Sequence, residues 1–142
     1  MTEYMCSETQ EILHKVMNYA YEHDVTCITT GELGAYTPSA AYPKRRRILI
    51  NLGFHDPYQI PYQAAHEVDH VIEQHSGVLY FRGEDLYGQE GEANRGALKI
   101  LVPLYFSDID MEVANPYRFM KALSIPNTMY DYVCETMTDY YA

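Results

Sequence analysis

Two histidines near the middle of the chain are spaced so that both could bind one metal ion, and a glutamate between them could act as a base. His66 and His70 are four residues apart, so on a helix they project about 40° from each other and both rings can reach one ion. Glu67 directly follows the first histidine and lies close enough to take a proton from a water that the metal activates. The H-E-x-x-H pattern therefore predicts a zinc hydrolase in which His66 and His70 are ligands and Glu67 is the general base.

A hydrolytic zinc site needs a third protein ligand, and a helix downstream of the two histidines is the expected source. Glu90 points the same way as the packed alanine face of the predicted helix, whereas Glu92 lies on its flank. We predict Glu90 as the third ligand and keep Glu92 as the alternative. A carboxylate in a first helical turn is also stabilised by the helix dipole without any metal. The full set of candidates is Glu84, Asp85, Glu90 and Glu92.

The composition indicates one soluble globular domain. The chain has 142 residues, of which 47% are apolar and 21% are charged, and this length is sufficient to bury a core. We expect an α+β fold over residues 1–142, with a zincin-like core in residues 1–110 and a helical part in residues 111–142. No run of about 18 apolar residues occurs, so no transmembrane helix is expected.

Cysteine usage and the N-terminal segment bear on the cellular location. The first eight residues contain neither a basic region nor an apolar core, so we expect no secretory signal. Cys6, Cys27 and Cys134 are odd in number and form no C-x-x-C pair. They are typical of reduced thiols, and we therefore expect a cytoplasmic protein.

The charge balance argues against a general nucleic-acid-binding surface. The formal net charge is −10 at pH 7, whereas contacts to phosphates need a basic footprint. Residues 44–47 (K-R-R-R) nevertheless hold four of the ten basic residues. They form either a charged flank that protects a sheet edge or a docking patch for an acidic partner segment.

The first half of the chain supplies the predicted sheet. Its strongest strand places Ile48 and Ile50 on one face and Leu49 on the other. These strands predict a small antiparallel-type sheet against which the metal-binding helix rests. The predicted elements are a helix over 7–23 with Ser7 as its N-cap, a strand over 25–30, a proline-containing edge or irregular strand over 35–41, and the strongest strand over 46–52.

The second half of the chain is predicted to be mostly helical. Gly77 predicts the end of the H-E-x-x-H helix because glycine is favoured just past helix C-termini. Pro103 predicts the end of the next helix. The predicted elements are the H-E-x-x-H helix from near 59–62 to 76–77, a short strand or packed loop over 78–81, helices over 89–102 and 116–123, and a helix from Pro126 with Met129, Val133, Met137 and Tyr140 along one face.

Residues 65–70 (A-H-E-V-D-H) and 90–103 (E-G-E-A-N-R-G-A-L-K-I-L-V-P) together resemble the ImmA/IrrE family of metallopeptidases. Members of that family show A-H-E-x-x-H, followed by E-x-E-A-N-x-F-A and a leucine-rich stretch that ends at proline. The helix and small sheet before the motif and the C-terminal helices are also similar, so the resemblance covers most of the chain. It implies a minimal zincin-like fold and a zinc site made by His66, His70 and Glu90.

Two positions depart from the family pattern. Asp69 stands where the family usually has a small residue, often glycine, and Gly96 stands where it usually has a bulky aromatic residue. Asp69 either adds a carboxylate near the metal or faces solvent, whereas Gly96 removes volume at a packed position. Neither position is a predicted ligand. Asp69 and Asn94 are candidate hydrogen-bond partners of the ligand histidines.

The resemblance also implies a function. Members of the family are intracellular peptidases that act on one dedicated protein, typically a helix-turn-helix repressor of a prophage or mobile element, so that cleavage would relieve repression. We expect no membrane partner and no direct contact with nucleic acid. A competing hypothesis is a non-proteolytic anti-repressor that binds its partner and keeps zinc as a structural clamp. A third is a member of the family that has lost its activity.

Overall fold

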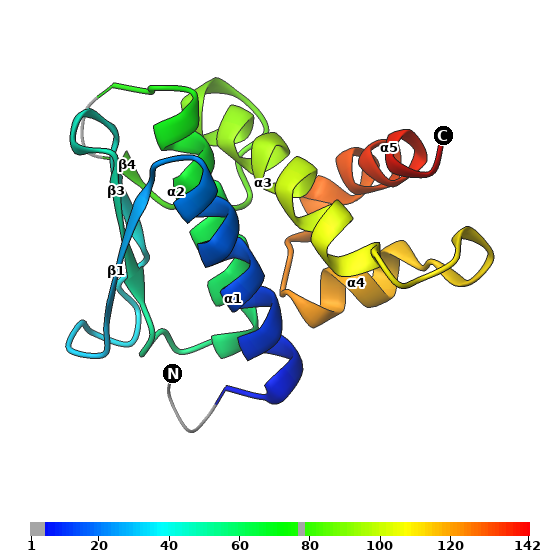
Figure 1. Cartoon of the computed structure of the whole chain (residues 1–142), viewed down its shortest axis with the longest axis horizontal. Coiled ribbons are helices and arrows are strands. Elements are labelled where there is room, and N and C mark those ends of the chain that lie inside the picture. The colour runs from blue at the N-terminus through cyan, green and yellow to red at the C-terminus, as the bar shows by residue number, and fades with distance from the viewer. Residues whose placement is uncertain (1–4, 77–78) are drawn as a thin grey trace.

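The computed structural model describes residues 5–76 and 79–142 and has an α+β fold in which helices cover one face of a small sheet (Figure 1). Among the described residues, no helix combines the length and the hydrophobicity that crossing a membrane requires. Short 3-10 turns precede β3, α2, α4 and α5. The elements are α1 (Ser7–Glu22), β1 (Thr26–Thr30), β2 (Ala40–Tyr42), β3 (Arg47–Asn51), α2 (Ile60–Ile72), β4 (Leu79–Tyr80), α3 (Gly88–Phe106), α4 (Pro116–Ala122) and α5 (Tyr130–Tyr141).

The four strands are arranged in the order β1-β3-β2-β4. β2 pairs antiparallel with β3 and with β4, whereas β1 pairs parallel with β3. The expectation of an antiparallel-type sheet is therefore wrong for β1. The chain reverses direction between β1 and β2 and again between β2 and β3, and β3 then inserts between its two predecessors. This central place agrees with the strong strand pattern of β3.

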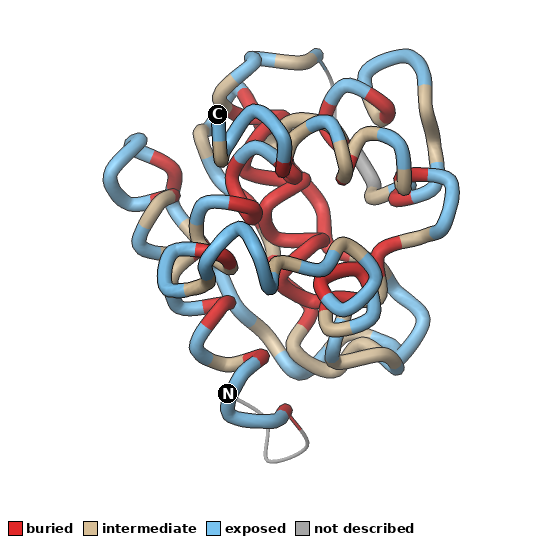
Figure 2. Tube along the Cα trace, turned by 90° about the vertical axis from the view of Figure 1, so that its right-hand side faces the viewer, coloured by how far each residue is buried: buried red, intermediate tan, exposed pale blue. Residues whose placement is uncertain are grey.

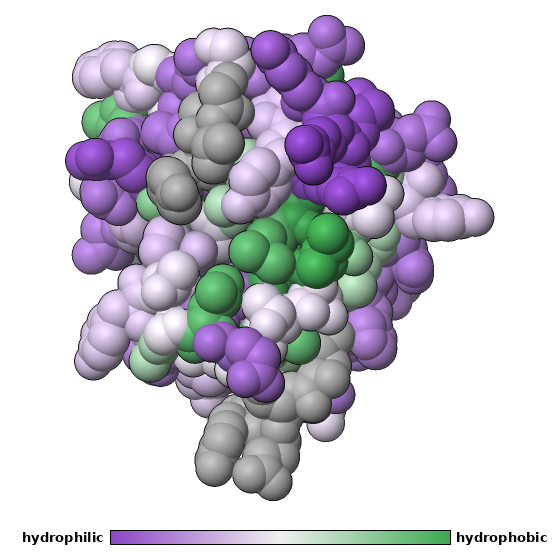
Figure 3. Space-filling model, turned by 90° about the vertical axis from the view of Figure 1, so that its left-hand side faces the viewer, coloured by the Kyte–Doolittle hydropathy of each residue, from purple (hydrophilic) through white to green (hydrophobic). Residues whose placement is uncertain are grey.

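The helices that the structure describes pack against one face of the sheet and leave the other face open to solvent. Ile48 and Ile50 are fully buried beneath the helices, as the alternation of β3 predicted, and Leu49 points to the other face. No helix within residues 5–76 and 79–142 covers that outer face, and Figure 3 shows apolar side chains at its centre beside strongly hydrophilic ones. Ile28 is 44% exposed there and lines a shallow surface pocket with Leu49 and Arg47.

Of the basic residues 44–47, the first three lie in the connection between the antiparallel strands β2 and β3, and Arg47 begins β3. Arg46 takes a left-handed conformation (φ 49°) and donates hydrogen bonds to the carbonyls of Asp24 and His23, at 3.0 and 2.6 Å. It therefore ties this hairpin to the turn between α1 and β1. The other three basic side chains are exposed.

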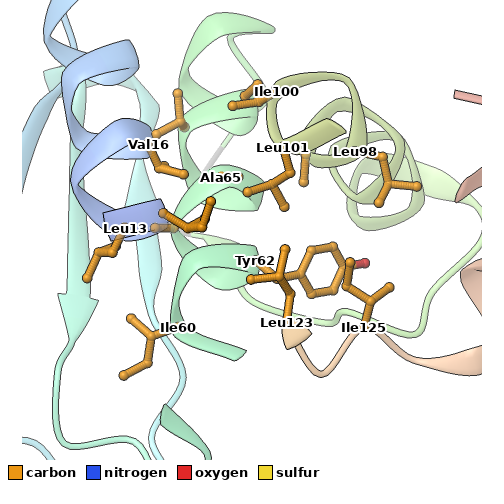
Figure 4. Packing of buried hydrophobic residues seen from close by; sticks show 14 of the residues in the cluster. Leu13, Val16, Ile60, Tyr62, Ala65, Leu98, Ile100, Leu101, Leu123 and Ile125 are labelled. Atoms are coloured by element: carbon orange, nitrogen blue, oxygen red, sulfur yellow. The ribbon is translucent and has the colours of Figure 1, made fainter. Parts of the chain in front are cut away.

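Helix α2 is the centre of the core. Every residue from Ile60 to Val71 is buried, and buried positions gather at the middle of the trace in Figure 2. Leu13 and Val16 of α1 lie on one side of Ala65, and Leu101 of α3 lies on the other (Figure 4). Because alanine is small, both neighbouring helices can approach α2 closely. The polar residues of the H-E-x-x-H motif are consequently enclosed by protein.

Helix α2 ends earlier than predicted, at Ile72 rather than at 76–77. Gln74 has a positive φ of 55°, and the backbone N–H of His75 donates to the carbonyl of His70 at 3.0 Å. The left-handed residue turns the chain back onto α2 before any glycine is reached. The predicted stop at Gly77 lies outside the described residues.

Helix α3 continues through Pro103 to Phe106, so the predicted stop at Pro103 is wrong. The missing N–H of proline leaves the carbonyl of Lys99 without its helical donor. Both residues are exposed, so water can solvate that carbonyl. Phe106 is 2% exposed and packs against Phe119, with ring centroids 5.3 Å apart, and this contact stabilises the last turn.

The remaining helices follow the predictions with small shifts. Helix α1 begins at Ser7, but Cys6 is its N-cap residue and makes no side-chain capping bond. The Asn115 side chain caps α4 by accepting from two backbone N–H groups. A 3-10 turn over Asn127–Met129 precedes α5. Of the predicted apolar face, Met129, Val133 and Met137 are buried and Tyr140 is 37% exposed.

Asp69 and Gly96 face each other across the α2–α3 interface. A Cβ atom added to Gly96 would lie 2.1 Å from Cγ of Asp69 and 2.2 Å from each carboxylate oxygen. Asp69 is only 7% exposed, so its carboxyl group fills the volume that glycine leaves free. Asp69 therefore does not face solvent, and the two departures from the family pattern compensate each other sterically.

Gly96→Ala should lower the free energy of unfolding by about 1–3 kcal/mol, as is usual for an overpacked core. In the Asp69→Gly background the clashing carboxyl is gone, and alanine is the better helix former by up to about 1 kcal/mol. The same change should then stabilise the protein. Urea unfolding of the wild type, both single variants and the double variant measures this reversal of sign. An equal loss of unfolding free energy from Gly96→Ala in the wild type and in Asp69→Gly would contradict the steric compensation between positions 69 and 96.

A second prediction concerns pH. Burial, together with the negative charges of Glu73 and Glu92 and against the opposing charge of Lys99, raises the pKa of Asp69 from 3.8 to about 7. The native state thus binds this proton more tightly than the unfolded chain does. Its contribution to stability is greatest below the unfolded pKa and is lost as the pH rises to about 7. Asp69→Asn keeps the shape and removes the titration, so it should raise the melting temperature more at pH 8 than at pH 5.

Candidate metal centre

Three side chains from α2 and α3 converge on one point. The Nε2 atoms of His66 and His70 are 3.0 Å apart. Glu90 bridges them, with Oε1 2.9 Å from His66 Nε2 and Oε2 3.0 Å from His70 Nε2. Both histidines are fully buried, and the Glu90 side chain is 15% exposed. The three ligand atoms lie within 4.8 Å of one another, so this group could hold a metal ion.

The structure places the four candidate carboxylates in different environments. Glu90 lies in the first turn of α3 and belongs to the cluster, whereas Glu92 is 51% exposed and lies beside His75. Glu84 and Asp85 precede the helix, and the Asp85 carboxylate pairs with Arg82 Nε at 3.1 Å. Because α3 begins at Gly88, Glu90 is the candidate that faces both histidines.

Asn94 fixes the orientation of the His66 ring. Its Nδ2 donates to the backbone carbonyls of Arg82 and Asp85, at 2.9 and 2.8 Å. Its Oδ1 must therefore face His66 Nδ1, which lies 2.6 Å away. An amide oxygen can only accept, so Nδ1 carries the imidazole proton. The lone pair of Nε2 is consequently directed into the cluster, as a metal ligand requires.

The loop over residues 82–87 is held in place so that it can orient Asn94. The hydroxyl of Tyr62 donates to the carbonyl of Gly83 at 2.9 Å, and Arg95 donates to the carbonyl of Leu86 at 2.7 Å. Gly91 allows this loop to touch α3, because a Cβ there would lie 2.2 Å from the Leu86 carbonyl carbon. Position 91, between Glu90 and Glu92, therefore requires glycine because a larger side chain would clash with the loop.

Aromatic rings form one side of the site. Phe81 meets the His66 ring edge to face, with centroids 4.9 Å apart, and meets Tyr62 in the same manner at 5.5 Å. Such contacts restrict rotation of the imidazole and are favourable by about 0.5–1.5 kcal/mol each. The ligand ring is thus held by packing on its face and by Asn94 at its edge.

The protonation states of the ligands suit a cation. Burial lowers the pKa of His66, which favours the neutral imidazole. Burial alone would raise the pKa of Glu90, but its close contacts with His66 and His70 outweigh burial and lower the pKa to about 2. The cluster therefore combines a neutral imidazole with an ionised carboxylate.

Glu67 is buried without a hydrogen-bond partner. Its side chain is 0% exposed, and among the residues that the structure describes neither carboxylate oxygen has a partner. Burial first, and the charge of Glu90 second, raise its pKa well above the ordinary value. Oε1 lies 3.6 Å from His66 Nε2, at the edge of the cluster. A partnerless buried carboxyl group is unfavourable unless a further polar group completes the site, so these residues fit a bound metal with its water.

His75 is a site residue that the sequence prediction missed. Its Nδ1 lies 2.7 Å from Nδ1 of His70, and its Nε2 lies 3.3 Å from Oε1 of Glu92. Residues five apart on a helix do not share a face, so helical spacing could not reveal this contact. Of the two candidate partners for the ligand histidines, Asn94 contacts His66, whereas Asp69 packs on Gly96.

Comparisons of the chain with protein-family models, curated proteins and solved structures found no match.

Asn94→Leu keeps the size of the side chain and removes the acceptor of His66 and both donors to the loop. We expect metal affinity to fall by about 10–100-fold, as for other partners of ligand histidines. The melting temperature should also fall, because two carbonyls lose their donor. Competition with a chromophoric chelator and thermal unfolding with and without Zn²⁺ measure both effects. Asn18→Leu, at an exposed position of α1, is the matched control. Wild-type affinity in Asn94→Leu would contradict the assigned tautomer.

Proposed function

We propose that this chain is a zinc-dependent endopeptidase. The most direct support is the buried Glu67 carboxyl group, which has no hydrogen-bond partner in the described part of the chain and lies beside the cluster of His66, His70 and Glu90. Two imidazoles and one carboxylate are a ligand set of catalytic zinc sites, which leave the fourth position for water or substrate. A structural zinc site, by contrast, is closed by four protein ligands, and the cluster among the described residues has three.

Each side chain has a role in the proposed reaction. A bound zinc ion supplies Lewis acidity, which polarises the scissile carbonyl and makes water easier to deprotonate. Glu67 accepts the proton of the attacking water at its carboxylate and then delivers it to the leaving amine. Burial and the charge of Glu90 raise the pKa of Glu67, which makes its carboxylate a stronger proton acceptor than an exposed glutamate. His66, His70 and Glu90 hold the ion, and Asn94 keeps His66 in the required tautomer.

The proposed substrate is a helix-turn-helix repressor of a prophage or mobile element. Support comes from the resemblance of residues 65–70 and 90–103 to the ImmA/IrrE metallopeptidases. Cleavage would inactivate the repressor and switch on the genes that it silences. The net charge of −10 agrees with a protein that acts on the repressor rather than on its DNA. The reaction would take place in the cytoplasm.

Glu67→Gln should abolish cleavage of the proposed helix-turn-helix repressor substrate while zinc affinity stays within a few-fold of the wild type. The amide cannot accept the proton, but it leaves all three ligands in place. It also removes the penalty for burying a carboxylate, so the free energy of unfolding at pH 8 should rise rather than fall. Gel electrophoresis of the repressor, chelator competition and urea unfolding measure the three quantities.

Two controls accompany this experiment. Glu22→Gln makes the same change at an exposed position and should cleave normally. His66→Ala should lose both zinc and cleavage. Undiminished cleavage by Glu67→Gln would refute the proposed mechanism. Relief of repression by Glu67→Gln without any cleavage would instead favour the non-proteolytic anti-repressor.

A further inference from the structure

We propose that His75 and Glu92 form a positioning pair that holds the ligand His70 in the tautomer required for metal binding. The inference rests on the proposed metal centre and concerns residues outside its ligand set. It assigns Glu92 a role different from that of a ligand. His75 and Glu92 come from segments on either side of β4, the first just after α2 and the second in α3.

The backbone after α2 delivers His75 to this place. The left-handed turn at Gln74 reverses the chain, and the bond from His75 N–H to the His70 carbonyl (3.0 Å) fixes the return. The two imidazole rings then meet edge to face, with centroids 4.9 Å apart and planes at 73°. The His75 side chain is only 9% exposed, so protein rather than solvent surrounds the contact.

The chemistry of the two rings decides the direction of the hydrogen bond. Two facing imidazole nitrogens 2.7 Å apart need one donor and one acceptor. His75 Nε2 is buried and makes no hydrogen bond within the described residues, but Glu92 Oε1 lies 3.3 Å from it. The negative charge of this carboxylate favours the proton of a neutral His75 on Nε2, which leaves Nδ1 as the acceptor. His70 must then donate from Nδ1, which leaves the lone pair of its Nε2 facing the cluster.

The two ligand histidines are therefore oriented by different hydrogen-bond acceptors. His66 donates to an amide whose other end is committed to two backbone carbonyls. His70 donates to an imidazole whose own state is set by Glu92, a side chain that is 51% exposed. Because solvent can replace an exposed acceptor, loss of Glu92 should weaken metal binding less than loss of His75.

Zinc affinity of the full chain tests the pair. His75→Leu removes the acceptor for His70, and we expect the zinc dissociation constant to rise about 10–100-fold. His75→Asn offers an amide oxygen at a similar position and should recover most of that loss. Glu92→Ala should give a smaller increase. His14→Leu makes the same change at an exposed position of α1 and should bind zinc as the wild type does. Chelator competition, with circular dichroism to verify folding, measures all four variants.

A measurement on the wild type alone covers the case in which His75→Leu does not fold. In the zinc-loaded protein, imidazole ¹⁵N spectra should show His75 protonated at Nε2 and His70 protonated at Nδ1. A His75 ring protonated at Nδ1 instead would overturn the inference.

The outcomes separate this inference from the proposed function. A wild type that binds zinc, with unchanged affinity in a folded His75→Leu variant, overturns only the role of His75. Equal losses in His75→Leu and His75→Asn overturn it as well, because shape rather than the acceptor would then matter. A wild type that binds no zinc overturns both proposals. Selective loss in His75→Leu with recovery in His75→Asn supports the pair.

Discussion

The hydrogen bond between His66 Nδ1 and Asn94 Oδ1 joins α2 to α3, and the geometry of the candidate site depends on it. An amide has one donor end and one acceptor end, and the donor end of Asn94 is committed to carbonyls of the loop over residues 82–87. The loop, the helix and the imidazole thus form one unit. Glu90 stands four residues before Asn94, so the same face of α3 that sets the tautomer also carries the predicted third ligand.

Helix α2 carries these polar groups through the centre of the core, and the structure satisfies most of them. Gln63 accepts from the backbone N–H of Ser39, which also ties α2 to the segment before β2. Glu67 is the exception, because its buried carboxyl group has no partner among the described residues. A fold tolerates such a cost where the group has a task, and packing around α2 offsets it. The unfavourable burial of Glu67 is thus compatible with its proposed role as the general base.

The sequence predicted the parts of the molecule that depend on short-range patterns. Helical spacing identified α2 and the side of α3 that carries Glu90, and strand alternation identified the buried face of β3. The parts that it could not predict depend on contacts between distant residues. The parallel pairing of β1 with β3 is one of these. Burial of Phe106, which carries α3 past Pro103, is another. The contact of His75 with His70 depends on the left-handed conformation of Gln74, which no residue pattern predicted.

Asp69 and Gly96 are the two residues that differ from the ImmA/IrrE motif pattern. On the surface of α3, Gly96 belongs to a different row of side chains from the predicted ligand Glu90. Glu90 and Asn94 are four residues apart on α3 and face the ligand histidines, whereas Glu92 and Gly96, with the same spacing, face His75 and Asp69. A larger side chain at position 69 of α2 is accommodated by the glycine at position 96 of α3, and this change in the second row leaves the contacts of the first row intact. Charge acts within the second row, because Glu92 contributes to the raised pKa of Asp69. The pair at positions 69 and 96 therefore acts on the stability of the interface that supports the site rather than on the ligand set.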